Sequence, residues 1–162
     1  MPLRDQETAA LMLVAGAAMT LAAAWYFQLV IGLAPCPLCL DQRIAYYAAI
    51  PLGLLTYWAA RGERRGVARA LLVVLGLAMV GNSALAVYHA GIEWHFWPGP
   101  TTCTGTPNLG GDILSALRKT EVPSCDQAAW RLFGISMAGW NALIAAGLAL
   151  VAFGGATTRR DA

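Results

Sequence analysis

Charged residues are scarce in this sequence. Only 12% of its 162 residues are Asp, Glu, Lys or Arg, whereas 58% are hydrophobic. A soluble domain could not wet its surface with so little charge. The net charge of +2 comes without any basic stretch interleaved with aromatic residues, which excludes a nucleic-acid-binding protein. The composition therefore predicts a protein that lies in a lipid bilayer.

Internal repeats and low-complexity tracts are also missing, so neither a solenoid nor a disordered linker is expected. No strand pattern alternates with helical patterns, which excludes a thioredoxin fold around the cysteines. Residues 1–162 are therefore interpreted as a single integral-membrane domain.

Four apolar stretches are long enough to cross a bilayer, which takes about 20 residues of helix. They cover residues 9–33, 44–60, 68–90 and 133–156. The first is interpreted as a retained helix rather than a cleaved signal peptide, because Arg4, Asp5 and Glu7 before it carry no net positive charge. The predicted fold class is an all-α membrane protein, a four-transmembrane-helix bundle with a long periplasmic loop, about 91–131, between the third and fourth helices.

Arginines are unevenly distributed between the two sides of this bundle. Arg61, Arg64, Arg65 and Arg69 crowd the link between the second and third spans, and positive charges in short loops resist translocation. We therefore expect a multi-pass protein of the bacterial inner membrane with both termini cytoplasmic. All four cysteines then lie on the oxidising, periplasmic side. Aromatic residues expected near this outer boundary are Tyr46, Tyr47, Tyr88, Trp94, Phe96, Trp97 and Trp130.

Two cysteines form a Cys-x-x-Cys motif where the outer link enters the second helix. Cys36 is predicted to be the N-cap, with Pro37 at the first helical position and Cys39 at the third. Backbone N–H groups at a helix start stabilise a thiolate, the form that attacks disulfides. Arg43 follows Cys39 by four residues and shares its helix face. We expect Arg43 to act at this site, and the alternative is an arginine that reaches to lipid headgroups.

A Cys-x-x-Cys motif alone is compatible with redox chemistry, half a zinc site or an inert bridge. No metal site is predicted, because Cys103 and Cys125 are too far apart in sequence to form a second zinc knuckle. These two residues could instead staple a loop rich in glycine and proline. Two pairs on one side of a membrane, one of them at the lipid boundary, favour a relay by thiol–disulfide exchange from a soluble thiol to a lipid-soluble oxidant.

In these residues the chain resembles the disulfide bond formation protein B family (DsbB-like) along nearly its whole length. The matching segments are Phe27-Gln28, Pro35 to Cys39, Arg43, the stretch from His89 to Pro100 before Cys103, and Ser124-Cys125 followed by Trp130, Phe133-Gly134 and Trp140. The resemblance implies a thiol:quinone oxidoreductase that generates protein disulfides. It would reoxidise a periplasmic thioredoxin-like thiol oxidase (DsbA-like) and pass the electrons to ubiquinone or menaquinone.

The resemblance also implies roles for individual residues. The catalytic set would be Cys36, Cys39, Cys103 and Cys125. The partner would attack Cys103, and the released Cys125 would pass the exchange on to Cys36, while Cys39 would sit against the quinone ring. Arg43 and His89 would bind the quinone. For His89, the alternative is an interfacial histidine bonded to backbone or headgroup.

Three further polar residues, Asn82, Ser83 and Asn141, lie inside the predicted helices and are expected to bond across the bundle rather than bind a ligand. Two rival functions stay open. One is a non-enzymatic membrane scaffold or transporter subunit whose cysteines form structural disulfides. The other is a reductase that runs the relay in reverse. A change of about 30 mV in reduction potential shifts a two-electron couple by about 1.4 kcal/mol, so modest tuning of the cysteine pairs can reverse the direction of electron flow. Pro37 between the cysteines and a short loop between Cys103 and Cys125 depart from the family pattern and leave the identity of the partner open. The sequence names neither the quinone nor the oligomeric state.

Overall fold

The computed structural model describes residues 6–100, 103 and 124–157. These residues form four α-helices and one short antiparallel hairpin. The helices are α1 (Gln6–Leu29), α2 (Pro37–Arg61), α3 (Arg65–Glu93) and α5 (Met137–Ala156), and the hairpin strands are β1 (Arg131–Leu132) and β2 (Ile135–Ser136). Most of the predicted loop 91–131 lies outside the described residues.

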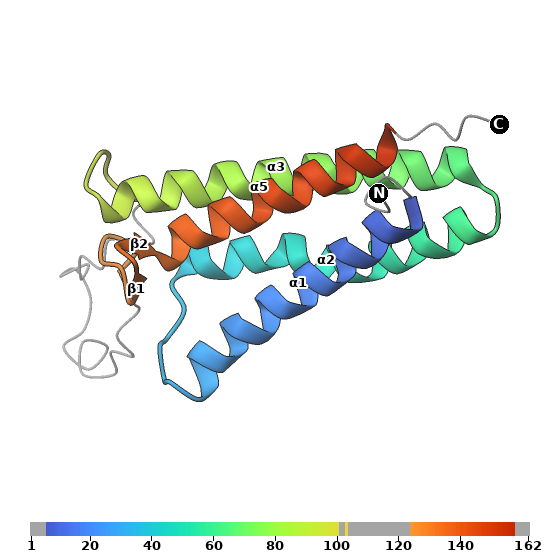
Figure 1. The fold of residues 1–162 in the computed structure, drawn as a ribbon. Coiled ribbons are helices and arrows are strands. Elements are labelled where there is room, and N and C mark those ends of the chain that lie inside the picture. The colour runs from blue at the N-terminus through green and yellow to red at the C-terminus, as the bar shows by residue number, and fades with distance from the viewer. Residues whose placement is uncertain (1–5, 101–102, 104–123, 158–162) are drawn as a thin grey trace, which may run out of the picture.

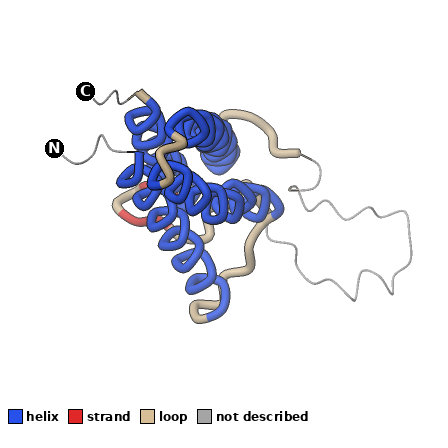
Figure 2. Tube along the Cα trace, turned by 90° about the vertical axis from the view of Figure 1, so that its right-hand side faces the viewer, coloured by secondary structure: helices blue, strands red, loops and turns tan. Residues whose placement is uncertain are grey.

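The helices run alongside one another, and the bundle has two distinct ends (Figure 1). The link from α1 to α2 lies with β1 and β2 at one end, which we call the cysteine end. The link from α2 to α3 lies with the start of α1 and the end of α5 at the other end, which we call the arginine end (Figure 1). Seen along the bundle, the start of α1 and the end of α5 lie on the same side (Figure 2).

Three of the helices, α1, α3 and α5, are long and apolar enough to cross a membrane. Helix α2 is of similar length, 25 residues, but carries Asp41 and Arg43 near its start and Pro51 in its middle. Many large apolar side chains point outward, including Leu29 at 70% and Leu150 at 74% exposure, as lipid rather than water allows. The chain is a helical membrane protein, as predicted from its composition.

Small residues bring the helices together. The main core contains Ala9, Leu13, Ala17, Leu21, Tyr46, Ala49, Leu72, Leu75, Met79, Leu148, Ala149, Ala152 and Ala156. A Cβ atom placed on Gly155 would lie 2.5 Å from the Cβ of Ala9, so α5 and α1 meet there without an intervening side chain. Close van der Waals packing of this kind holds helices together in lipid, where burial of apolar surface contributes little.

The first predicted span is wrong at its C-terminal boundary. It was expected to continue to Leu33, but α1 ends at Leu29 and the chain turns through Gly32, whose φ is +81°. Because the residues of this turn are apolar, composition alone does not separate them from the helix. The second and third predicted spans lie inside α2 and α3.

The last predicted span is wrong at its N-terminal boundary. It was expected to begin at Phe133, but Phe133 and Gly134 have φ of 51° and 80° and form the turn between β1 and β2. Helix α5 begins only at Met137, after Ser136, whose hydroxyl accepts a hydrogen bond from the Gly139 N–H at 3.2 Å. A side-chain cap of this kind fixes the start of a helix.

One of the predicted boundary aromatics, Tyr46, is a core residue. It is 2% exposed, and its hydroxyl donates to Asn141 Oδ1 at 2.5 Å. Tyr88 and Trp97 stack near the end of α3 with their ring centroids 6.0 Å apart. Trp94 is exposed, as expected for a boundary residue. Helical periodicity places Tyr46 on the same face as Gln42, which is also buried.

Candidate active site

The first turn of α2 has the predicted geometry. Cys36 is the N-cap, Pro37 is the first helical residue, and the Cys39 N–H donates to Cys36 Sγ at 3.2 Å. Both thiols are free, and Cys36 Sγ donates to Cys39 Sγ at 2.7 Å. This hydrogen bond, together with burial, raises the pKa of the Cys36 thiol. Cys36 therefore keeps its proton, and Cys39 is the sulfur placed to carry negative charge at the positive end of the helix.

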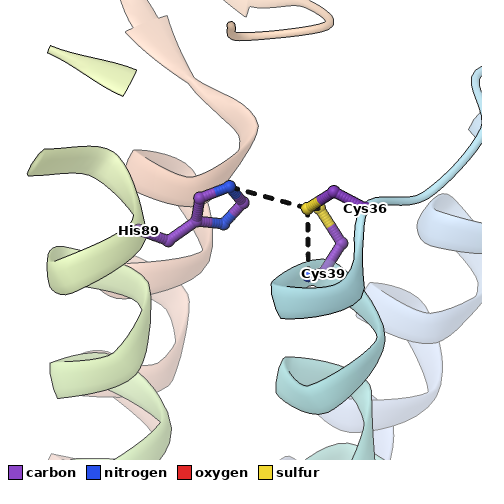
Figure 3. A group of neighbouring side chains, drawn as sticks. All are labelled: Cys36, Cys39 and His89. Atoms are coloured by element: carbon purple, nitrogen blue, oxygen red, sulfur yellow. Dashed lines mark hydrogen bonds between the residues drawn. The ribbon is translucent and has the colours of Figure 1, made fainter. Parts of the chain in front are cut away.

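His89 reaches this pair from α3 (Figure 3). Its Nε2 lies 3.6 Å from Cys36 Sγ, and its Nδ1 lies 3.0 Å from Gln42 Nε2. One turn further along α3, Glu93 places Oε1 at 3.9 Å from the same Nε2. The His89 ring is only 3% exposed. Its partners are thus buried side chains of the bundle rather than lipid headgroups.

Cys36, Cys39 and His89 are also residue types that bind zinc, and their ligand atoms lie within 4.8 Å of one another. Two thiolates on one tetrahedral zinc, each at about 2.3 Å from the metal, would lie about 3.8 Å apart. The observed sulfur separation is 2.7 Å. This geometry suits a thiol pair poised to form a disulfide better than a pair that shares a metal.

Polar side chains continue from His89 across the bundle. Gln42 Oε1 accepts from Asn141 Nδ2 at 2.6 Å, and Asn141 Oδ1 in turn accepts from Tyr46. Asn141 thus bonds across the bundle, as predicted, and so does Ser83, whose hydroxyl donates to the Ala142 carbonyl at 2.9 Å. The Nδ2 of Asn82 is buried and has no hydrogen-bond partner among the described residues.

Sequence reasoning missed Gln42, although a signal was present. It is an amide in the first part of a largely apolar helix, four residues after Leu38 and four before Tyr46, both of which are buried. A polar side chain on the inward face of a membrane helix is costly unless it has a partner, and such a residue is by default a candidate for function.

A cavity of about 260 Å³ opens between α1, α2, α5 and the hairpin. Its walls are mostly apolar, formed by residues such as Leu21, Phe27, Leu33, Pro35, Trp130, Met137, Trp140 and Ile144. Polar or reactive side chains on the wall include those of Cys39, Gln42, Arg43, His89 and Asn141. An apolar pocket with a few polar groups is the usual form of a small-molecule site.

Helix α1 holds Arg43 at the wall of this cavity. The Arg43 guanidinium donates from Nη1 to Gln28 Oε1 at 2.6 Å and from Nη2 to the Ala24 carbonyl at 3.5 Å. Its Cζ lies 5.8 Å from the centre of the Trp25 ring, within range of a cation–π interaction. These are protein groups, so the structure places the side chain toward the cavity rather than extended to headgroups.

Cys103 and Cys125 are joined in a disulfide. Both are buried, at 2% and 1% exposure, and they pack in one cluster with Cys36, Leu38 and Ile92. Cys39 lies at the edge of this cluster and also lines the cavity. The structure therefore brings all four predicted cysteines together, with Cys36 on the side of the disulfide and Cys39 on the side of the cavity.

Known proteins resemble this chain along most of its length. The sequence pattern of the family described as "Disulfide bond formation protein DsbB" matches residues 6–154. The chain is 33% identical over 155 residues to disulfide bond formation protein B of Xanthomonas euvesicatoria pv. vesicatoria, covering 87% of this chain and 85% of the relative.

Two other relatives have the same name. The protein of Verminephrobacter eiseniae is 31% identical over 138 residues, with 81% of this chain and 75% of the relative covered. That of Stutzerimonas stutzeri is 29% identical over 145 residues, with 84% and 85% covered. No solved structure matches the chain significantly. The helical membrane fold, the clustered cysteines and these relatives together make the chain a quinone-linked membrane oxidoreductase that forms disulfides, and it belongs to the disulfide bond formation protein B family.

Proposed function

We propose that the chain accepts electrons from a periplasmic DsbA-like dithiol at Cys103 and Cys125 and delivers them through Cys36 and Cys39 to ubiquinone or menaquinone. One observation carries this proposal: Cys36 lies in one buried cluster with the Cys103–Cys125 disulfide, whereas Cys39 packs at the edge of that cluster and also lines the cavity. Disulfide exchange requires direct contact between sulfurs. A single Cys-x-x-Cys pair that faces both a disulfide and an apolar cavity can connect the two.

Each exchange step breaks one S–S bond and forms another. A partner thiolate attacks Cys103, and Cys125 leaves with the electron pair of the broken bond; the second partner thiol then closes the partner's own disulfide. Cys125 next attacks Cys36 in its disulfide with Cys39, and Cys39 leaves as a thiolate. Cys103 then attacks Cys125 and releases Cys36, so the loop disulfide is restored and the two electrons reside on Cys36 and Cys39.

The cavity suits a quinone in its chemistry. A bound quinone would accept two electrons and two protons as Cys36 and Cys39 close into a disulfide. The apolar walls exclude water and match a ring with an isoprenoid tail. Arg43 offers the site a permanent positive charge, and Gln42 and Asn141 place amides on the same wall. Which quinone is used depends on how these groups meet its oxygens and substituents.

The two ends of the bundle support the proposed orientation in the inner membrane. The link from α2 to α3, which carries Arg61, Arg64 and Arg65, lies at the end opposite the link from α1 to α2 (Figure 1). We propose that α2, which packs against α1 and α3, is the fourth span. Reporter fusions at both termini and within residues 61–69 should therefore report a cytoplasmic location. A fusion at Asn108 should report the periplasm, and a cytoplasmic signal there would overturn the topology together with the redox route.

The function is tested with the purified protein in lipid nanodiscs. With a reduced DsbA-like dithiol and a soluble ubiquinone or menaquinone analogue, one quinone should be consumed for each dithiol, that is, for every two thiols. Cys39→Ser should stop quinone consumption while Cys103 can still exchange with the partner. Absence of turnover with both quinones would refute the proposal, and net reduction of the partner by a reduced quinone under the same conditions would favour the reverse relay.

A further inference from the structure

The hydrogen bonds that lead to His89 have a direction. The Tyr46 hydroxyl donates to Asn141 Oδ1 at 2.5 Å, which leaves the Asn141 amide NH₂ to donate to Gln42 Oε1 at 2.6 Å. The Gln42 oxygen is thereby occupied, so the Gln42 NH₂ is the group that faces His89 Nδ1 at 3.0 Å. The chain of hydrogen bonds from Tyr46 on α2 through Asn141 on α5 to Gln42 on α2 thus directs the NH₂ group of Gln42 at one nitrogen of the imidazole.

A donor at Nδ1 decides where the His89 proton lies. The Nδ1 atom must accept, so a neutral imidazole carries its hydrogen on Nε2. Nε2 is the nitrogen that faces Cys36 Sγ at 3.6 Å (Figure 3). The carboxyl group of Glu93, whose Oε1 lies 3.9 Å from Nε2, is a second acceptor on that side.

The bonds around Cys36 lead independently to the same assignment. The thiol hydrogen of Cys36 is directed at Cys39 Sγ, 2.7 Å away. Across the contact with His89, the sulfur can then only accept, and the imidazole must donate. His89, Gln42 and Tyr46 are 3%, 5% and 2% exposed, so water does not compete for these bonds.

We propose that Gln42, supported by Asn141 and Tyr46, is a positioning residue that holds His89 in the tautomer whose Nε2–H donates to the sulfur of Cys36. The inference rests on the exchange route proposed above, in which Cys36 leaves from its mixed disulfide with Cys125. In that step the S–S bond between Cys36 and Cys125 breaks, the bond between Cys103 and Cys125 forms, and the electron pair stays on Cys36. The Nε2–H stabilises this developing thiolate.

The tautomer can be observed directly, because the chain has only two histidines. His95 is exposed and has a φ of +59°, a conformation that asparagine tolerates, so His95→Asn leaves His89 as the single histidine. Nitrogen-15 NMR of this protein, at a mildly alkaline pH that keeps imidazole neutral, should show the proton on Nε2.

Asn141→Asp should reverse the donor–acceptor direction of the hydrogen bonds that join residue 141, Gln42 and His89. A carboxylate only accepts, so Gln42 must turn its NH₂ toward residue 141 and offer its oxygen to His89, which moves the proton to Nδ1. Asn141→Leu frees the Gln42 amide to take either orientation, so both tautomers should appear. Ser83→Ala is the matched control, because Ser83 also bonds from α3 to α5, at Ala142, but lies outside these hydrogen bonds.

A second measurement tests the chemical consequence without quinone. One equivalent of dithiothreitol is added to the fully oxidised protein, and acid quenching followed by thiol tagging counts free thiols at each cysteine pair over time. Reduction of the Cys103–Cys125 disulfide should be unchanged in Asn141→Asp. Transfer to Cys36 and Cys39 should slow about tenfold or more, the loss expected for one hydrogen bond to a charged group.

A proton on Nδ1 in the single-histidine parent would overturn the proposal. So would retention of Nε2–H in both Asn141 variants, or transfer at the parental rate in a variant whose tautomer has switched. Failure of the underlying relay looks different: thiols would never appear at Cys36 and Cys39, whatever the tautomer of His89. Ser83→Ala should preserve both the tautomer and the transfer rate.

Discussion

Buried polar side chains make different kinds of hydrogen bond in the two halves of the bundle. We call the half next to the cysteine end the cysteine half and the half next to the arginine end the arginine half. In the arginine half, Gln6 donates to the Arg65 carbonyl and Thr56 donates to the Leu52 carbonyl of its own helix. In the cysteine half, Gln42 and His89 bond to each other, and Gln42 bonds also to Asn141. A bond to a backbone carbonyl satisfies one polar group, whereas a network of side chains fixes the orientation of every member.

The same helices therefore perform two tasks along their length. Close packing of small residues in the arginine half holds α1, α3 and α5 together, and the polar half orients the groups that surround the sulfurs. Substitutions in the cysteine half should change the redox activity more than the free energy of unfolding. Substitutions in the arginine half should change the free energy of unfolding more than the redox activity.

The largest effect is expected where the cysteine half meets the partner. Cys103→Ser should abolish oxidation of the soluble dithiol yet leave Cys36 and Cys39 able to be oxidised by quinone, because the second pair is built on α2 and does not depend on the loop disulfide. Thiol tagging after addition of quinone to the reduced variant measures this. Oxidation of the partner at the parental rate would mean that the loop disulfide is merely structural.

A smaller effect, on the cavity alone, is expected from Arg43. Arg43→Ala should raise the KM for quinone about tenfold or more, because a charge-assisted donor is lost from the cavity wall. Arg43→Lys should rescue only part of the loss, since its ammonium lacks the planar fork that contacts Gln28 and Ala24 together. The measurement is turnover against quinone concentration.

Exchange with the dithiol in the absence of quinone serves as the control for Arg43 and should be nearly unchanged. If Arg43→Ala left the quinone kinetics intact, the main task of Arg43 would be to anchor α2 to α1.

The smallest effect on chemistry is expected in the arginine half. Gly155→Ala should destabilise the bundle by about 1–3 kcal/mol, the usual cost of overpacking, because its Cβ would meet that of Ala9 at 2.5 Å. Gly147→Ala, on the same helix with no atom within 4 Å of the new Cβ, is the matched control and should not destabilise. Denaturant titration in detergent compares the two. A raised KM for quinone in folded Gly155→Ala would contradict the assignment of stability to the arginine half and of redox chemistry to the cysteine half.

Local chemistry made part of this structure predictable. The long apolar runs predicted the helices, and the order Cys36, Pro37, Cys39 predicted the cap, because a helix start depends on neighbouring residues only. The helix ends at Leu29 and Met137 were missed, since the turns beside them are as apolar as the helices. Tyr46 was placed at the boundary because its class favours interfaces, and only tertiary contacts show that it is buried.

The candidate site divides in the same way. Cys36, Cys39 and Arg43 were predicted as site residues from residue type and spacing along one helix, and Cys103 and Cys125 as a second pair on the outer loop. The link between Gln42 and Asn141 joins residues 99 positions apart, and no periodicity reports such a contact. The cluster that holds Cys36 together with the loop disulfide likewise depends on how α2 and α3 meet the returning chain.

The contact between Arg43 and α1 also bears on how the protein enters the membrane. An arginine in a helix costs about 2.5–3.5 kcal/mol at the bilayer centre and less toward the surface, and α2 carries Asp41 close by. The partners that neutralise this cost, Gln28 and the Ala24 carbonyl, belong to the helix synthesised just before. We therefore expect α1 and α2 to insert as a hairpin, with the first helix guiding the second into lipid before it becomes a wall of the cavity.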